Sequence, residues 1–399
     1  MFQPLNSKTE HKKIFGFQKN VFVAGLVSLF MDISSEMIYP LVPLFLATVL
    51  GTTKTTIGLI EGIAESTASI LKVFSGYLSD VLGRRKLLMA IGYGVSVLSR
   101  PVTALSTTWF HVLFARFVDR FGKGIRTAPR DAIIADSADG NNLGRAFGFH
   151  RTMDTIGAVI GPAIAFFILL LFANNFRLVF WLSLIPGIIA VILIVFFITE
   201  KRKTRDELAK LPKITFKDFN GDFRHYIVVI ALFSIGNTSD AFLILRAENL
   251  GVSKEYIPII YLMFNLVYSV SSMPLGILAD KIGMRKMIIL GFIFYALIYF
   301  GFGIADSSFY VLPLFCLYGI FKGMSEGTQR AYLATLAPPE RKATAFGVYH
   351  TVVGISLLPA SIIGGILWDK IGAEATFFYG AVTGFISAVL FILLVRNSR

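Results

Sequence analysis

Two carboxylates and a tyrosine share one face of the first apolar stretch of the chain. Asp32, Glu36 and Tyr39 are spaced at i, i+4 and i+7, as on one side of an α-helix. Two carboxylates one turn apart in a medium of low dielectric repel each other, so we expect one of them to bind a proton reversibly near neutral pH. The alternative is that each is permanently paired with a basic residue such as Arg116 or Arg151.

Further acidic residues lie within later apolar stretches. Asp154 follows His150 by one turn, and Asp240 lies near the end of another stretch. We predict that Asp154 or Asp240 carries the proton if Asp32 and Glu36 do not. His150 is interpreted as a structural histidine, and we expect Glu61, Glu65 and Lys72 to form structural ion pairs.

Basic residues suggest the charge of a ligand. Arg116, Arg120 and Lys123 share one face of the stretch 109–134, and Lys322 lies at the corresponding place in 309–334. Opposed cations near the middle of a membrane suit a carboxylate or phosphate group. The candidate binding residues are therefore Tyr39, Arg116, Arg120, Lys123, Lys322 and Glu326. The alternative is that the cations only neutralise the acidic residues Asp119, Glu326 and Asp240.

Composition places these residues in a membrane protein. Hydrophobic residues make up 55% of the 399 residues, charged residues 16%, and the mean hydropathy is +0.69, far on the apolar side of a soluble domain. A membrane-spanning helix takes about 20 apolar residues, which predicts an all-α membrane protein with twelve transmembrane helices. The predicted helices are 20–47, 56–78, 87–106, 109–134, 146–172, 178–198, 225–247, 257–279, 287–305, 309–334, 344–367 and 376–395.

The basic residues between these stretches predict the orientation. Segments on the side of the termini hold 23 lysines and arginines, against 4 on the other side. Basic loops stay in the cytoplasm, so we expect a multi-pass protein of the cell (inner) membrane with both termini cytoplasmic. The charge of +13 is mostly this signal, and no nucleic-acid partner is expected. The partners expected are the lipid bilayer and a small-molecule substrate, bound by a monomer.

A repeat divides the chain into two equivalent halves. Gly76-x-x-x-Asp80-x-x-Gly83-Arg84-Arg85-Lys86 recurs two hundred residues later as Gly276-x-x-x-Asp280-x-x-Gly283-Met284-Arg285-Lys286. Such a repeat is typical of transporters. It predicts two pseudo-symmetric six-helix bundles, 1–199 and 225–399, joined by a cytoplasmic linker over 200–224.

These phrases resemble the signature of the major facilitator superfamily between its helices 2 and 3, and the resemblance covers about residues 18 to 396. Pro40-Leu-Val-Pro43 is similar to the Pro-x-x-Pro of twelve-helix drug:proton antiporters. Helix 5 also resembles the antiporter pattern, with Ala165 and Phe166 in place of its final glycines. The residues of that pattern are Gly148, Gly157, Gly161 and Pro162.

The hairpins of the signature are predicted to form a conformational latch. We expect Arg84 and Arg85 to pair with Asp131 or Asp136, and Asp80 to meet the start of a helix in the other half. These contacts would hold an outward-facing state. The residues assigned to the latch are Gly76, Asp80, Gly83, Arg84, Arg85, Asp131, Asp136, Gly276, Asp280, Gly283 and Arg285.

The sequence therefore predicts a secondary active transporter working by alternating access. The resemblance favours proton-coupled export of a small polar or amphipathic molecule carrying negative charge. Proton-coupled uptake of an organic anion is the first alternative, and a non-transporting membrane receptor or scaffold is the second. No enzyme activity, metal or cofactor is expected, and the driving force is the proton gradient.

Overall fold

The computed structural model describes residues 13–82, 84–138, 143–200, 221–337 and 342–395. A short hairpin, β1 (Lys13–Ile14) and β2 (Phe17–Gln18), precedes the helices of the first half. These helices are α1 (Lys19–Ile38), α2 (Val42–Leu44), η1 (Phe45–Val49), α3 (Lys54–Leu82), α4 (Arg85–Leu105), α5 (Trp109–Ser137), α6 (Leu143–Leu171), α7 (Phe176–Leu182) and α8 (Leu184–Phe197). Each of the six stretches predicted in this half coincides with one helix or with a run of consecutive helices.

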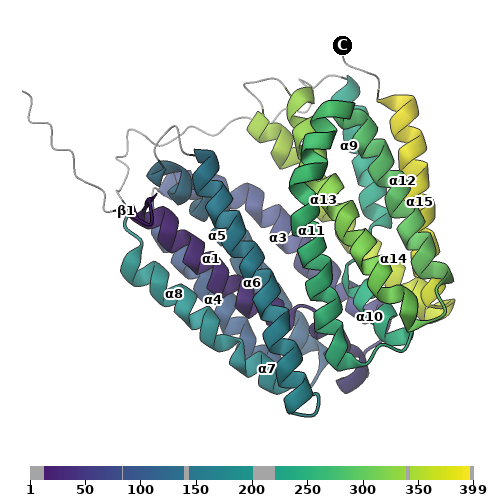
Figure 1. Cartoon of the computed structure of the whole chain (residues 1–399), viewed down its shortest axis with the longest axis horizontal. Coiled ribbons are helices and arrows are strands. Elements are labelled where there is room, and N and C mark those ends of the chain that lie inside the picture. Colours follow the sequence, from purple (N-terminus) through teal and green to yellow (C-terminus); the bar gives the residue numbers. More distant parts are fainter. Residues whose placement is uncertain (1–12, 83, 139–142, 201–220, 338–341, 396–399) are drawn as a thin grey trace, which may run out of the picture.

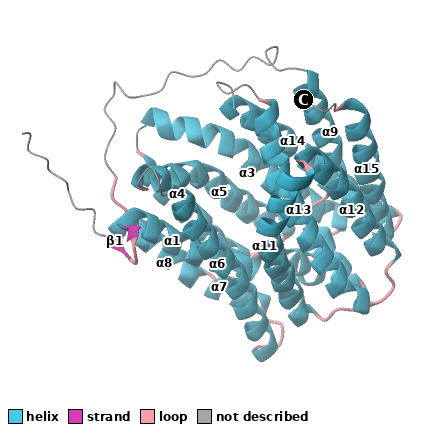
Figure 2. Ribbon diagram, turned by 45° about the horizontal axis from the view of Figure 1, so that its top comes forward, coloured by secondary structure: helices cyan, strands magenta, loops and turns pink. Residues whose placement is uncertain are grey.

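The second half repeats this order. Its helices are α9 (Gly221–Gly236), α10 (Ala241–Asn249), η5 (Lys254–Tyr256), α11 (Ile257–Ile282), α12 (Met284–Ile304), η6 (Ser308–Tyr310), α13 (Val311–Leu336), α14 (Lys342–Lys370) and α15 (Ala373–Leu394). The all-α class is thus as predicted (Figure 2). The predicted domain limits stay a prediction, and most of the predicted linker lies outside the described residues.

Three of the predicted helices are interrupted rather than continuous. The first breaks between α1 and α2, where Pro40 has no N–H to donate and the chain turns before η1. The sixth is divided at Ser183, three residues before Pro186, and the seventh at 237–240. The breaks in the first and seventh helices place Tyr39 and Asp240 at helix ends, where exposed backbone groups can bind polar partners.

Two of the predicted membrane-spanning helices differ from the others in the charged residues that they contain. Among the described residues, ten helical segments are long and apolar enough to cross a membrane. The two predicted spans that do not reach this measure are α3 and α5. They contain the predicted ion-pair residues Glu61 and Glu65 and the candidate binding residues Arg116, Arg120 and Lys123.

The two halves lie side by side and approach each other at one end (Figure 1). We call the end where α1 begins and α15 ends the linker end; it is at the top of Figure 1. At the opposite end, Asp369 of α14 accepts hydrogen bonds from the backbone N–H of Lys54 and of Thr55, at 3.0 and 2.7 Å. Nearer the middle, Ser66 of α3 donates to the carbonyl of Gly354 on α14 at 2.6 Å. The α3–α14 pair therefore closes the molecule at the opposite end.

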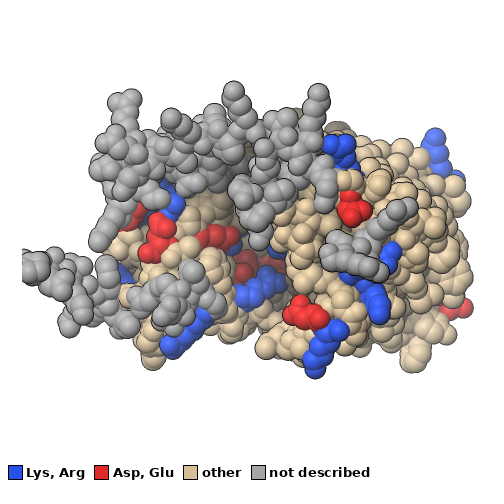
Figure 3. Space-filling model, turned by 90° about the horizontal axis from the view of Figure 1, so that it is seen from above, with Lys and Arg blue, Asp and Glu red and all other residues tan. Residues whose placement is uncertain are grey.

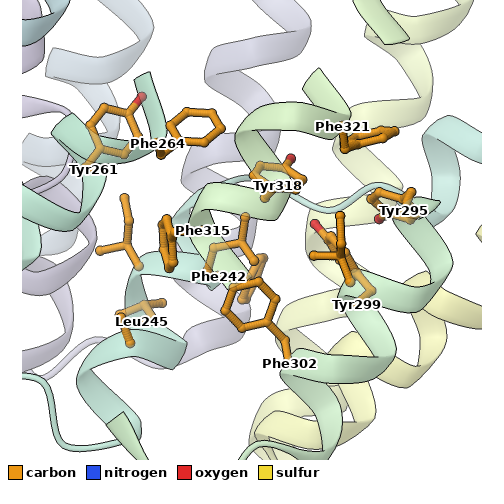
Figure 4. Close-up of a cluster of buried hydrophobic side chains, with 14 of the residues drawn as sticks. Phe242, Leu245, Tyr261, Phe264, Tyr295, Tyr299, Phe302, Phe315, Tyr318 and Phe321 are labelled. Atoms are coloured by element: carbon orange, nitrogen blue, oxygen red, sulfur yellow. The ribbon is translucent and has the colours of Figure 1, made fainter. Parts of the chain in front are cut away.

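Aromatic rings form much of the core of the second half. Figure 4 shows Tyr295, Tyr299, Phe302, Tyr318 and Phe321 packed between α12 and α13. The rings of Tyr295 and Tyr299 lie 4.1 Å apart, and those of Tyr295 and Phe321 lie 5.1 Å apart. This packing fixes α13, the helix that carries Lys322 and Glu326.

The outward faces of several helices are apolar. Large side chains are exposed on α8, α12 and α15, for example Phe196, Leu297 and Leu393. Such a surface suits lipid rather than water. These faces lie on helices that carry few charged residues.

Candidate central site

A hollow lies between the two halves and opens at the linker end. Figure 3, seen from that end, shows Lys, Arg, Asp and Glu side chains inside it. The hydrogen bonds that join the halves, as far as described residues show, run from mid-helix to the opposite end. The charged residues of both halves therefore meet in a space that one end of the molecule closes.

Two glycines of α6 position the carboxylates of α1. A Cβ added at Gly157 would lie 2.8 Å from the Cβ of Asp32, and one at Gly161 would lie 3.0 Å from the Cβ of Glu36. Only glycine lets the two helices approach this closely. These two positions of the predicted antiporter pattern thus fix α1, whereas a Cβ at Gly148 would meet nothing within 4 Å.

Asp32 and Glu36 are half-buried and lack a close basic partner. Among the described residues, neither carboxylate has a Lys, Arg or His nitrogen within 4.0 Å, and Oε2 of Glu36 has no hydrogen-bond partner. The expected alternative, permanent pairing with Arg116 or Arg151, is not what the described contacts show. The two acids interact instead over longer range with each other and with Lys123.

The arginines of α5 are already paired with acids of α3. Arg116 forms a two-pronged ion pair with Glu61, and Arg120 lies 2.9 Å from Glu65. The ion pairing predicted for Glu61 and Glu65 is thus observed. Buried ion pairs of this kind are costly to break, so Arg116 and Arg120 mainly hold α5 against α3. We call these two arginines the basic framework.

Asp119 belongs to the same network. Arg100 of α4 lies 3.3 Å from Asp119 and donates to Ser34 of α1 at 3.2 Å. Arg120 also lies 3.8 Å from Asp119, so the alternative that the cations of α5 neutralise Asp119 holds for Arg120 but not for Lys123, which has no carboxylate within 4.0 Å among the described residues.

Tyr39 lies where the two halves touch. The guanidinium groups of Arg116 and Arg120 lie 5.4 and 5.6 Å from its ring, and the ring of Tyr261 on α11 lies 5.4 Å away. Tyr261 also interacts with Glu36. The break after α1 thus places an aromatic ring between the basic framework and the second half.

Two cations of α5 lack an acid. No carboxylate lies within 4.0 Å of Lys123 or of Arg126 among the described residues. Arg126 donates to Ser96 and lies 4.4 Å from the Tyr93 ring. Neither side chain is thus balanced by a carboxylate in direct contact among the described residues.

In the second half, the candidate residues form two linked groups. Lys322 lies 3.5 Å from Asp240, which also accepts a hydrogen bond from Tyr318 at 2.6 Å. The suggestion that Lys322 neutralises Asp240 is thus observed. It also means that Lys123 and Lys322 are not equivalent, because only Lys322 has a direct acidic partner.

Glu326 joins the halves through a tyrosine. It accepts a hydrogen bond from Tyr268 at 3.0 Å, and the same hydroxyl accepts one from Arg151 of α6 at 3.0 Å. Arg330 also lies 3.0 Å from Glu326. Glu326 is therefore a bridge between α13, α11 and α6.

Asp154 lies beside α1. It accepts a hydrogen bond from Ser28, and His150 Nδ1 lies 3.6 Å from its carboxylate. Asp154 also interacts with Asp32 over longer range. Three of the four acids predicted to carry protons thus interact with one another in the first half, and Asp240 belongs to the second half.

The hairpin residues are only partly within the described part of the chain. Gly83 lies outside it, as do the surroundings of Gly76 and the Asp80 side chain. Arg85 pairs with Asp136, as expected, whereas Asp131 pairs with its neighbour Arg130 at 2.9 Å. The latch itself stays a prediction.

In the second hairpin, Arg285 donates to the carbonyls of Val395 and Ile392 at 2.9 and 3.0 Å and so holds the end of α15. Gly283 has φ 97°, a conformation that favours glycine, and Asp280 is exposed. A Cβ at Gly276 would meet nothing within 4 Å. The contacts of Arg285 thus stay within its own half.

Sequence reasoning missed four side chains that interact with the candidate residues. Arg126 continues the basic face of α5 one turn beyond Lys123, which the helical spacing could have indicated. Tyr261, Tyr268 and Tyr318 gave no such signal, because aromatic residues at helical spacing are usual in any core. Among the described residues, no group of three or more side chains could hold a metal ion.

Comparisons with known proteins agree on one family. A family model described as the Major Facilitator Superfamily matches residues 24–245 and 226–399. An uncharacterized MFS-type transporter of Methanocaldococcus jannaschii is 37% identical over 386 residues, which cover 94% of this chain and 95% of that protein. A multi-drug resistance efflux pump homologue of Lactococcus lactis is 24% identical over 380 residues, 91% of each chain. Among solved structures, a POT family transporter in complex with 5-aminolevulinic acid aligns with a TM-score of 0.81 at 14% identity, covering 96% of this chain and 97% of that one.

Proposed function

The chain belongs to the Major Facilitator Superfamily, and we propose that it is a secondary active transporter that exports a small, negatively charged polar or amphipathic molecule in exchange for protons. Family membership confirms the resemblance drawn from the sequence and the predicted fold, and it makes the chain a membrane transporter. Alternating access, the coupling ion, the direction and the substrate are the parts that we propose.

One observation carries the proposal. Within the described part of the chain, two acids without a basic partner, Asp32 and Glu36, interact over longer range with cations that lack an acidic partner, Lys123 and Arg126. These acidic and basic side chains do not form direct ion pairs with one another. A proton on the acids and an anion on the cations would satisfy both sets, since unpaired charges in a membrane interior are costly.

The acids and the cations are close enough to influence each other's ligands. Lys123 interacts with Asp32 and Glu36 over longer range. An anionic substrate that binds Lys123 withdraws positive charge from the acids and favours their protonation, while loss of the proton favours release of the anion. This reciprocal linkage favours binding of substrate and proton in the same conformation, which is what uptake by symport requires.

By itself this linkage favours symport, so export in exchange for protons is supported by separate observations. Export is supported by the efflux pumps among the relatives, such as the Lactococcus lactis protein, and by the close packing of Gly157 and Gly161 against α1. Uptake of an organic anion by proton symport is the second candidate, because Lys123 and Arg126 would serve it equally well.

The orientation follows from the loops. Because basic loops remain in the cytoplasm, the linker end is the cytoplasmic end and the hollow faces the cytoplasm. The described conformation is then the one that would receive a cytoplasmic substrate. Opening the other way requires the contacts of Asp369 with α3 to break.

Everted membrane vesicles test the proposal most directly. A pH-sensitive dye inside the vesicles reports proton release when a candidate anion is added outside, since the cytoplasmic face of the protein is then exposed. Export by exchange predicts anion accumulation and luminal alkalinisation that depend on the protein. Accumulation in right-side-out vesicles accompanied by acidification would support symport instead, and accumulation of cations alone would contradict the anionic substrate.

A further inference from the structure

The β-hairpin that precedes α1 lies at the outer edge of the first half, at the linker end (Figure 1 and Figure 2). Its two strands are antiparallel, with Ile14 opposite Phe17. The ring of Phe17 stacks on that of Phe149 of α6, with 4.4 Å between the ring centroids, and the ring of Phe22 of α1 lies 5.8 Å from the same ring. The hairpin is therefore packed on α1 and α6 rather than extended into solvent.

The side of α6 on which the hairpin packs faces away from the second half. Residues at helical spacing share this side, and the last two are exposed apolar side chains: Arg145, Phe149, Ile156 and Ile160. The hydrogen bonds of α6 with α11 come from another side, through Arg151, Thr155 and Ala158. Because exposed apolar side chains of a membrane span suit lipid, the hairpin lies where the lipid-facing side of α6 reaches the membrane surface.

Phe15, at the tip of the hairpin, combines two unfavourable features. Its backbone is left-handed, with φ 49°, in a two-residue turn of the kind that favours Asn, Asp or Gly. Its side chain is also 83% exposed. A bulky residue with positive φ is a strained outlier, and such outliers cluster at functional positions. An apolar medium around the tip would remove the cost of exposing this ring to water.

A cation lies beside the tip. The guanidinium carbon of Arg145 lies 4.7 Å from the centroid of the Phe17 ring, and a Cβ added at Gly16 would lie 3.2 Å from its Nη2. Arg145 is exposed, and among the described residues it has neither a carboxylate within 4.0 Å nor a hydrogen-bond acceptor. A guanidinium stacked on a ring keeps its planar set of donors free for a phosphate group.

We propose that the hairpin is a membrane anchor, in which the Phe15 ring inserts into the leaflet at the linker end and Arg145 binds the phosphate of an anionic phospholipid. Aromatic rings prefer the boundary between headgroups and acyl chains, and basic side chains beside it attract anionic lipids. The anchor lies outside the hollow, so it is independent of the substrate, the coupling ion and the direction of transport. Because Phe17 and Phe22 join the hairpin to α6 and α1, the anchor would hold the start of both helices at the membrane surface.

Fluorescence quenching in vesicles tests the depth of the tip. In a Cys316→Ser background, the full-length Phe15→Cys variant is labelled with bimane and reconstituted into phosphatidylcholine vesicles. We expect strong quenching by a phospholipid with a nitroxide near the start of its acyl chain, and little by iodide present on both sides of the membrane. Lys286→Cys, at the exposed hairpin before α12, is the aqueous reference and should give the reverse. Quenching at position 15 by iodide alone would place the tip in water, and protection from both quenchers would mean that protein covers it; either result refutes the anchor.

The same label tests the charge of the bound lipid. Nitroxide-labelled phosphatidylglycerol, at a low fraction in phosphatidylcholine vesicles, should quench as if enriched about fivefold over nitroxide-labelled phosphatidylcholine, the ratio expected for one basic residue near the surface. Arg145→Gln should abolish this preference, whereas Arg145→Lys keeps the charge and should retain it within about twofold. Lys286→Gln is the matched control and should leave the preference unchanged.

Two results would overturn the assignment of Arg145. One is equal quenching by the two lipids in the protein that retains Arg145, and the other is a preference that survives in Arg145→Gln. Gel-filtration profiles identical to that of the unsubstituted protein would exclude misfolding as the cause of a loss.

Discussion

At the residue scale, Asp32 and Glu36 lack, among the described residues, the arginine partner that other acids of the interior have. Glu61, Glu65 and Asp119 each lie close to a guanidinium group. A buried carboxylate held in this way keeps its charge. Asp32 and Glu36 have no such partner among the described residues, so their charge can change without breaking an ion pair.

Replacing both acids of α1 should uncouple transport from protons. In the Asp32→Asn, Glu36→Gln double variant, we expect uphill transport in everted vesicles to be lost, while exchange of labelled substrate across the membrane remains. The amides keep the shape of the side chains but cannot release a proton. Asp306→Asn, in the exposed loop before α13, is the control. Uphill transport that survives in the double variant would assign the proton to Asp154 or Asp240 instead.

The ion pair of Glu61 with Arg116 should contribute to stability rather than to coupling. Glu61→Gln leaves a buried guanidinium without its counter-ion, which costs about 3–5 kcal/mol. We expect a clear fall in the thermal unfolding midpoint measured by intrinsic fluorescence. Glu374→Gln is the comparison: Glu374 is 51% exposed, and its partner Arg246 also donates to the carbonyls of Phe302 and Ala305, so the loss should be smaller. Equal falls in the two variants would contradict the framework role of Arg116.

At the element scale, the contact of α1 with α6 depends on two glycines. Gly157→Leu would force its side chain into the backbone of Leu29 and the Cβ of Asp32. We therefore expect loss of transport and a lower yield of folded protein. Gly148→Leu should be tolerated, since its Cβ would enter open space. Fluorescence-detected gel filtration followed by transport assays would measure both, and similar losses in the two variants would show that α1 packing is not the cause.

Much of this arrangement was predictable because it follows from local rules. Runs of apolar residues indicated the places of the twelve predicted helices. The glycines of 148–161 were noted only as a resemblance, and their contact with α1 came from the structure. The spacing of Asp32, Glu36 and Tyr39 also placed them on one face. Each of these inferences needs only the periodicity of a helix.

The partners of the charged residues were less predictable. Arg116 pairs with Glu61 rather than with Asp32 or Glu36, and Lys322 pairs with Asp240 while Lys123 has no direct partner. These choices depend on how the helices rotate about their axes and on breaks such as that after Ile38. Neither the rotation of a helix nor the position of such a break can be predicted from the sequence of a single helix. The symmetry of the sequence therefore predicts equivalent positions but not equivalent contacts.

At the scale of the whole molecule, the two ends differ in how the halves are joined. At the opposite end, the carboxylate of Asp369 binds the first N–H groups of α3 and the hydroxyl of Thr55 at 2.7 Å. A carboxylate at a helix N-terminus is favoured because those N–H groups have no partner within the helix. At the linker end, the charges of the two halves surround a hollow instead. Transport by alternating access requires the contacts at the opposite end to break while the hollow at the linker end closes.

Holding the opposite end closed should therefore stop transport without harming the site. In a Cys316→Ser background, Thr55→Cys and Asp369→Cys place one thiol on each half, and a short reducible bifunctional thiol reagent can join them. We expect the cross-linked protein to bind substrate from the linker end but not to transport it, with transport restored by reduction of the linker. Each single-cysteine variant treated in the same way is the control. Full transport through the cross-linked protein would mean that this end does not open in the cycle, and the rocking of the two halves about the central site would have to be abandoned.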